Sequence, residues 1–115
     1  MNIDWIDGKL TFAPQKDELT LRGGGLINTN ILKRSLLRLL RPRHLRIQCP
    51  DMVDDDFLIG LDLFSLDCRG TPLKKVPQIV RMRSLRKIIV DLKQKELIQW
   101  LEGQHLDAEV IVIPQ

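Results

Sequence analysis

Apolar and polar side chains alternate in short runs along this chain, and the spacing changes several times from strand-like to helix-like. At the amino end, the pair Asp7-Gly8 separates two apolar-rich runs, residues 2–6 and 9–12. An Asp-Gly pair between such runs favours a β-hairpin, because both residues accept the positive φ of a tight turn. Residues 18–22 alternate polar and apolar side chains, which predicts a third strand.

Three helices are predicted from apolar residues spaced three or four positions apart. The longest covers residues 26–40, where Lys and Arg stand between leucines, and Pro42 ends it. A shorter helix covers residues 51–60, with three consecutive aspartates suited to the positive end of the helix dipole. The third helix covers residues 93–104.

Four further strands are predicted, at residues 45–49, 63–68, 86–92 and 109–113. The last two are rich in Ile and Val, which favour extended backbone. Pro77 limits residues 76–85 to a turn or two of helix. A hairpin followed by alternating strands and helices indicates one α/β domain, residues 1–115, built on a mainly parallel sheet.

An apolar triplet is repeated 24 positions later (61 to 85, 64 to 88, 66 to 90): Leu61, Phe64 and Leu66 recur as Leu85, Ile88 and Val90. In this L-x-x-L-x-L pattern, alternate residues of a strand point into a core. Residues 73–85 carry further spaced apolar residues, like the returning half of such a repeat. From residue 61 to residue 90, the chain resembles the leucine-rich repeat family. The resemblance implies a solenoid of short β-α repeats, with the hairpin as its amino-terminal cap.

The repeated Asn of that family, which satisfies backbone groups where each strand ends, has no counterpart here. The matching positions hold Gly24, Pro50, Arg69 and Lys93. A second architecture stays open, because residues 88–90 and 110–113 are continuous apolar runs. Such runs are typical of strands covered on both faces. They fit a compact α/β layer domain resembling the anti-sigma-factor antagonist domains.

An apolar content of 43% is enough for one core in a chain of 115 residues. Cys49 and Cys68 are too few for a disulfide scaffold and form no C-x-x-C pair, so we expect reduced, buried thiols. The amino end lacks the basic start and apolar run of a signal peptide. No apolar stretch reaches the roughly 18 residues of a membrane span. We therefore expect a soluble, cytoplasmic protein.

No residue pattern indicates a catalytic, cofactor or metal site. The glycine run at 23–25 precedes a predicted helix but lacks the spacing and the Lys of a phosphate-binding loop. The aspartates at 54–56 are consecutive, so on a helix they point in different directions and do not converge on a cation. His44 and His105 have no metal-spaced partner, and no serine lies in a G-x-S-x-G context. We expect a non-enzymatic protein without a cofactor or a metal.

The net charge is only +3, but the charges are sorted along the chain. A basic segment, residues 33–46, precedes an acidic one, residues 51–67, and residues 69–95 are basic again. Such alternation is typical of neighbouring elements with compensating surfaces. It also leaves open a nucleic-acid-associated accessory protein that binds phosphates through the basic helix and its continuation, residues 31–46. The candidate phosphate-binding residues are Lys33, Arg34, Arg38, Arg41, Arg43 and Arg46.

The repeat pattern favours protein recognition as the function, since sheet surfaces built from short repeats are commonly used to bind partners. The predicted contact residues are strand positions that point away from the repeat core. They are Thr20, Arg22, Arg46, Gln48, Ser65, Asp67, Ile89, Asp91, Ile111 and Ile113. The last strand is expected to be an uncovered sheet edge, which predicts a homodimer or a complex with another protein through residues 109–114.

Overall fold

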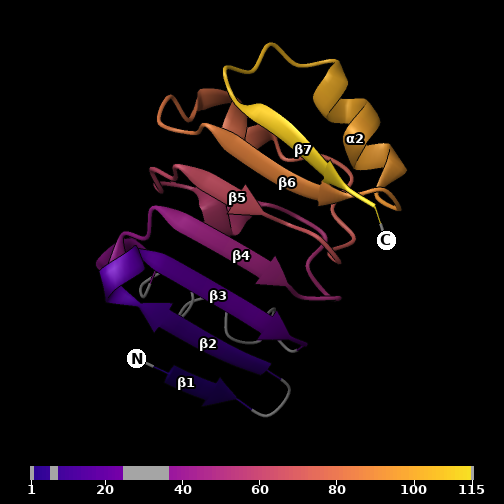
Figure 1. The fold of residues 1–115 in the computed structure, drawn as a ribbon. Coiled ribbons are helices and arrows are strands. Elements are labelled where there is room, and N and C mark those ends of the chain that lie inside the picture. Colours follow the sequence, from indigo (N-terminus) through magenta and orange to yellow (C-terminus); the bar gives the residue numbers. More distant parts are fainter. Residues whose placement is uncertain (1, 6–7, 25–36, 115) are drawn as a thin grey trace.

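The computed structural model describes residues 2–5, 8–24 and 37–114, which form a seven-stranded mixed sheet (Figure 1). The strands lie in the sheet in their order along the chain. The first three pair antiparallel: β1 (Asn2–Trp5), β2 (Gly8–Ala13) and β3 (Glu18–Gly23). The others run parallel to β3: β4 (His44–Gln48), β5 (Ser65–Asp67), β6 (Lys87–Asp91) and β7 (Glu109–Ile113). The prediction of a mainly parallel α/β sheet is confirmed.

The amino-terminal hairpin forms where the Asp-Gly pair predicts it, with Trp5 of β1 paired to Gly8 of β2. The 3-10 helix η1 (Pro14–Lys16) joins β2 to β3. Asp17 follows it with a φ of 50°, a left-handed conformation that Asp adopts more readily than most residues. The predicted hairpin and the third strand are therefore both confirmed.

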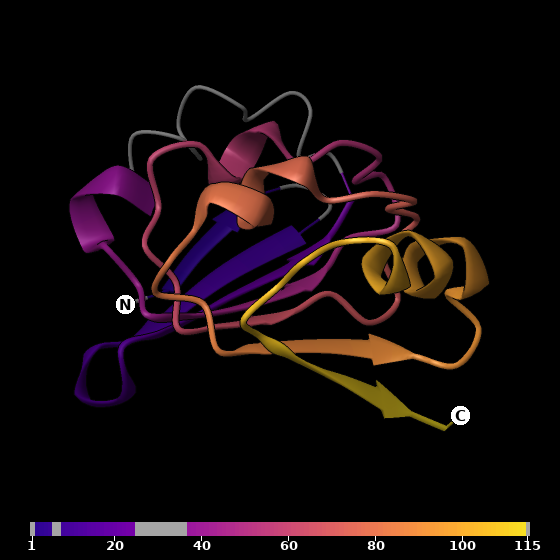
Figure 2. The same ribbon diagram turned by 90° about the horizontal axis from the view of Figure 1, so that it is seen from above.

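Three of the described helices, which connect the strands from β4 to β7, lie on one side of the sheet (Figure 2). They are α2 (Lys95–Glu102) and the 3-10 helices η3 (Asp56–Leu58) and η4 (Pro77–Arg81). Alternate strand residues face them as the core: Leu19, Leu21, Leu45, Ile47, Leu66, Ile88 and Val90. No described helix covers the opposite side, which differs from the coverage of both faces that the apolar runs suggested.

The parallel strands β4, β5 and β6 each begin where two successive N–H groups donate to the same backbone carbonyl of an earlier segment. The N–H groups of Arg43 and His44 both donate to the carbonyl of Asp17, and those of Phe64 and Ser65 both donate to the carbonyl of Arg43. The same arrangement recurs before β6, where the carbonyl of Phe64 accepts two N–H groups. Each of these three strands therefore starts at its own carbonyl, which accepts two N–H groups.

The repeat register differs from the predicted one by two residues. Leu66 of β5 pairs with Ile88 of β6, a shift of 22 (66 to 88) rather than 24. Phe64 is therefore not a core strand residue: it precedes β5, is half-buried, and lies with its ring 5.6 Å from that of His44, edge to face. The shared carbonyl at the start of β5 interrupts the regular ladder at this point. Cys68 is the buried residue that follows Leu66 in the alternation.

Residues 51–60 do not form the predicted helix, and only the single turn η3 is helical. Aspartate side chains compete here with helical backbone hydrogen bonds. The carboxylate of Asp54 accepts from the N–H of Asp56 at 3.2 Å. The carboxylate of Asp55 accepts from the N–H of Gln78 at 2.8 Å, which links two successive connections. Burial raises the pKa of Asp55.

The predicted helix at residues 26–40 lies mostly outside the described residues. Residues 37–40 are helical, and the N–H of Arg41 donates to the carbonyl of Leu37 at 3.0 Å. Arg41 then takes a φ of 47°, and Pro42 follows. The predicted end of this helix is confirmed.

Helix α2 confirms the predicted carboxyl-terminal helix and connects β6 to β7. Leu97 and Leu101 are its buried residues, and they belong to the core that the strands form. No helix in the described part of the chain is both long and apolar enough to cross a membrane.

Substitution of two neighbouring isoleucines tests which side of β6 faces the core. Ile88 is fully buried, whereas Ile89 is half-buried on the other side. We expect Ile88→Ala to lower the free energy of unfolding by about 2–5 kcal/mol. Ile89→Ala should lower it by about 1 kcal/mol or less. Urea denaturation of both variants measures the difference, and equal losses would contradict this orientation of β6.

Candidate interaction surface on the open face of the sheet

The side of the sheet opposite the helices, named here the open face, carries the residues that alternate with the core. One row across the strands joins Thr20, Arg46, Asp67, Ile89 and Ile111 in direct register. Neighbouring strands lie about 4.8 Å apart, so consecutive side chains of the row are adjacent. Predicted contact residues in the flanking rows share this face: Arg22, Gln48, Ser65 and Ile113.

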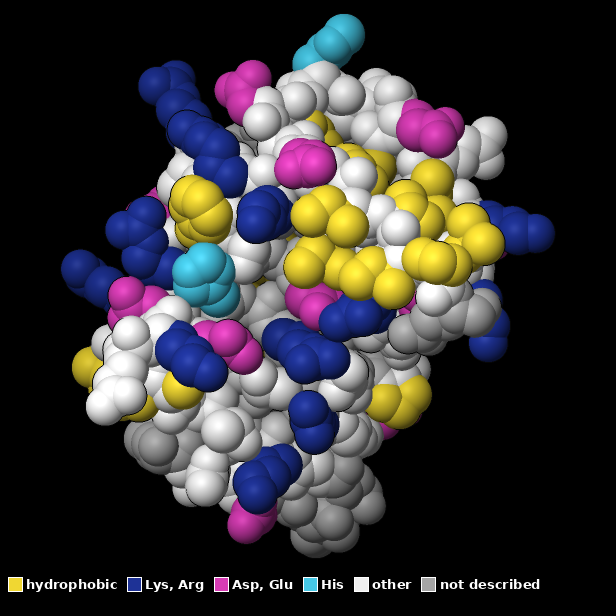
Figure 3. Space-filling view, viewed as in Figure 1, with side chains coloured by type: hydrophobic (Ala, Val, Ile, Leu, Met, Phe, Trp, Pro, Cys, Tyr) yellow, Lys and Arg dark blue, Asp and Glu magenta, His cyan; other side chains and the backbone are white. Residues whose placement is uncertain are grey.

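Three half-buried isoleucines on β6 and β7 form the apolar part of the open face. We call Ile89, Ile111 and Ile113 the isoleucine patch. Hydrophobic side chains gather over these two strands, and Lys and Arg side chains lie beside them over the middle of the sheet (Figure 3). β7 is the last strand and pairs only with β6, so the patch reaches the edge of the sheet, where that edge was expected.

A cluster of two arginines and one aspartate lies beside the patch. Arg69 donates to both carboxylate oxygens of Asp67, at 3.0 Å from Nε and 2.8 Å from Nη2, and these bonds raise the pKa of Arg69. The Nε of Arg46 lies 3.6 Å from Asp67 Oδ2 but makes no hydrogen bond within the described part of the chain. A small pocket, named here the arginine pocket, is lined by Arg46, Gln48, Arg69 and Gly70.

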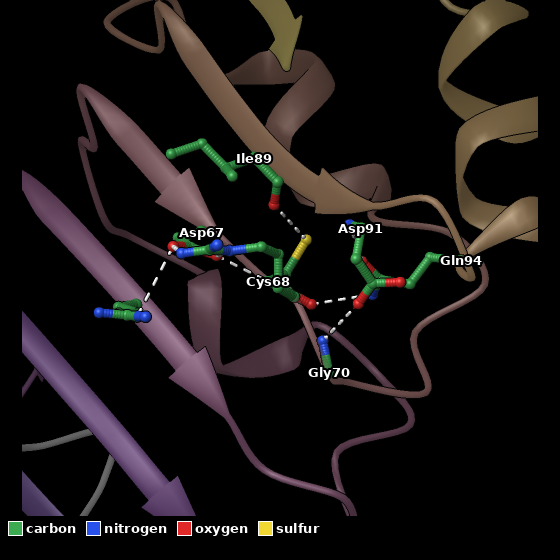
Figure 4. Close-up of polar contacts among 8 residues, drawn as sticks. Asp67, Cys68, Gly70, Ile89, Asp91 and Gln94 are labelled. Carbon is green, nitrogen blue, oxygen red and sulfur yellow. Dashed lines mark hydrogen bonds and ion pairs between the residues drawn. The ribbon is translucent and has the colours of Figure 1, made fainter. Parts of the chain in front are cut away.

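Asp91 is an exception among the predicted contact residues, because it is only 4% exposed. Its Oδ2 accepts from the N–H of Gly70 at 3.0 Å (Figure 4), and its Oδ1 accepts from the N–H of Lys93 at 2.9 Å. The carboxylate thereby joins the turns that follow β5 and β6. Asp91 is a structural residue, and its prediction as a contact residue is wrong.

Gln94 bonds the backbone groups at the ends of these strands. Its Nε2 donates to the carbonyl of Cys68 at 2.8 Å (Figure 4) and to that of Thr71 at 3.0 Å. Its Oε1 accepts from the N–H of Asp91 at 2.9 Å. Gln94 thus satisfies backbone groups where β5 and β6 end, and it stands one residue after Lys93, the position at which no Asn was found.

Both cysteines are thiols buried in the core, as expected. The thiol of Cys49 donates to the carbonyl of Leu21 at 3.4 Å, and that of Cys68 to the carbonyl of Ile89 at 3.6 Å (Figure 4). Burial raises the pKa of the Cys68 thiol to about 12. At neutral pH, Cys68 therefore carries almost no reactive thiolate.

His44 and Ser65 form a pair that no sequence motif indicated. They face each other across β4 and β5, with His44 Nδ1 2.6 Å from Ser65 Oγ. The ring of Phe64 lies against His44 on the same part of the molecule. Because the pair joins residues 21 positions apart, only the register of the two strands reveals it.

The structure separates the basic residues that were grouped as a nucleic-acid site. Lys33 and Arg34 lie outside the described residues. Arg38 and Arg41 line a pocket with residues 60–62 of the connection between β4 and β5. Arg43 is exposed just before β4, whereas Arg46 lies on the open face beside Asp67. Among the described arginines of this set, Arg38 and Arg41 thus line a different pocket from Arg46.

The most distinctive chemistry of the described surface is an apolar patch beside an arginine-rich pocket. No protein-family model, curated protein or solved structure matches the chain. What this surface binds must therefore follow from its own side chains.

The contacts of Gln94 lead to a stability prediction. Gln94→Met keeps the side-chain length but removes the donor and the acceptor, so we expect the free energy of unfolding to fall by about 1–3 kcal/mol. Gln99→Met, at an exposed position of α2, should change it by less than about 0.5 kcal/mol. Urea denaturation compares the two, and indistinguishable values would show that Gln94 does not stabilise the strand ends.

The raised pKa of Cys68 leads to a labelling prediction. At pH 8, we expect iodoacetamide to modify Cys68 at least about 100-fold more slowly in the folded protein than in urea. The folded-state rate should rise with pH until the pH approaches the thiol pKa of about 12, provided that the fold persists. Mass spectrometry of the labelled peptides measures both rates. Equally fast labelling in the folded protein would refute burial of this thiol.

Proposed function

We propose that this chain is a non-enzymatic protein-interaction module that binds a segment of a partner protein on its open face. The observation that carries the proposal is the isoleucine patch at the β6–β7 end of that face. Uncovered apolar residues at a sheet edge promote association, and proteins usually cover them. A partner that packs on the patch removes these side chains from water and stabilises the complex.

We also propose that β3 to β7 are coils of a short solenoid of the leucine-rich-repeat type. The core residues of successive strands are spaced by 26 (19 to 45), 21 (45 to 66), 22 (66 to 88) and 22 (88 to 110) positions. These spacings fall within the roughly 20–29 residues of such repeats. The shared carbonyls at the strand starts and the contacts of Gln94 support the same interpretation.

The charges beside the patch favour a different protein over a second copy of this chain. The arginine cluster has two guanidinium groups for one carboxylate, so it complements an acidic partner. A homodimer through residues 109–114 would pair two β7 edges and cover the isoleucines, but it would leave the arginine cluster unused. Sedimentation at micromolar concentration separates the two arrangements.

The proposal is tested with displayed random peptides about ten residues long, selected for binding to the full chain. Binding of the selected peptides is expected to weaken at least about 10-fold in Ile111→Lys, because burial of the patch then requires burial of a charge. Val80→Lys is the matched control, since Val80 is an exposed apolar residue of η4 and 47% exposed. Thermal melting confirms that both variants fold.

Two results would count against the proposal. One is selection of no peptide, and the other is peptide binding that Ile111→Lys leaves unchanged. Self-association that Ile111→Lys abolishes would instead support the homodimer. Binding of a single-stranded oligonucleotide that weakens steeply with salt and persists in Ile111→Lys would instead indicate phosphate contacts, and hence the nucleic-acid function.

A further inference from the structure

We infer that the arginine pocket binds a carboxylate of the partner, from an Asp or Glu side chain that lies beside the apolar residues seated on the isoleucine patch. The inference rests on the proposed function and adds the chemistry of the partner to it. Its basis is the hydrogen-bonding state of Arg46, the charge of the cluster, and the position of the pocket in the rows of the open face.

Arg46 has donor capacity left over. Its Nε is buried without a hydrogen bond in the described part of the chain, and its nearest carboxylate oxygen is 3.6 Å away, on Asp67. Asp67 is already engaged by Arg69 through both of its oxygens. The buried Nε itself is out of reach of an incoming group, but the side chain of Arg46 is 36% exposed, so a carboxylate can reach the outer part of its guanidinium. Guanidinium groups pair best with planar carboxylates, through two parallel hydrogen bonds.

The row that contains Arg46 favours a single carboxylate over a polyanion. The cluster carries one excess positive charge, because Asp67 compensates only one of the two arginines. On one side the row continues into Ile89 and Ile111, which offer nothing to a phosphate backbone. A segment with one acidic side chain among apolar ones complements both parts.

The register sets the spacing that such a segment needs. Arg46 lies on β4 and Ile89 on β6, with one strand between them. Two strand spacings are about 9–10 Å, which an extended peptide crosses in about three residues. We therefore expect the partner to carry an Asp or Glu about three residues from its apolar anchor.

A double-substitution experiment with the selected peptides tests the inference. The acidic residue of a peptide is replaced by its amide, and binding is measured by fluorescence anisotropy. With the wild-type chain, affinity is expected to fall about 10- to 100-fold. With Arg46→Gln, the same change in the peptide should lower the affinity by about 2-fold or less, since the guanidinium that pairs with the carboxylate is absent. Arg81→Gln, at an exposed arginine of η4, should keep the full loss.

The results separate failure of the inference from failure of the proposed function. The inference would be overturned if the selected peptides carried no Asp or Glu. It would also be overturned if the amide substitution lowered the affinity equally with and without Arg46. In both cases, binding that still depended on Ile111 would support the proposed binding surface. Binding that ignores Ile111 would overturn the proposed function itself. Displacement of the peptide by a single-stranded oligonucleotide would identify the pocket as a phosphate site and overturn the inference.

A second variant covers the case in which Arg46→Gln lowers the melting temperature. Arg46→Lys keeps the charge but does not form the two-pronged pair. With Arg46→Lys, replacing the acidic residue of the peptide by its amide is expected to lower the affinity at least about threefold less than it does with the wild-type chain. An undiminished loss would show that Arg46 does not hold the carboxylate.

Discussion

From β3 to β7, each strand forms parallel backbone hydrogen bonds with the next, and the helices α2, η3 and η4 that connect β4 to β7 lie on the same side of the sheet. Alternate residues of each strand are therefore buried beneath the helices, and the residues between them form the open face. The core leucines and the surface row that contains Arg46 and Asp67 are two consequences of this one arrangement. A change of register by one residue would exchange them.

The ends of the strands show how the fold satisfies its polar groups. Carbonyls of Asp17, Arg43 and Phe64 each accept two N–H groups at a strand start, while Asp91 and Gln94 bond the turns at the opposite ends. Buried polar groups are costly unless they are bonded. This requirement explains why a charged residue at the end of β6 is buried, and why it contributes to the fold and not to the open face.

In the proposed function, two kinds of side chain on the open face have different roles. The isoleucine patch supplies apolar area, which gives affinity with little direction. The arginine cluster supplies planar, directional donors, which give specificity. Because the strand register holds both in the same row, the distance between them is set by the backbone. The proposed recognition of an acidic and apolar segment depends on this fixed spacing.

The order of the strands along the chain, the amino-terminal hairpin and the carboxyl-terminal strand can be predicted from the sequence, because they depend on neighbouring residues. The Asp7-Gly8 pair predicts the hairpin of β1 and β2 from local sequence, and the alternation in residues 18–22 and 109–113 assigns each side chain to a face. Contacts between distant residues were not readable. The pairing of Leu66 with Ile88, the bond between Asp55 and Gln78, and the burial of Asp91 join segments more than 20 positions apart. No local spacing encodes them, since they arise only when the connections stack and each backbone group must find a partner.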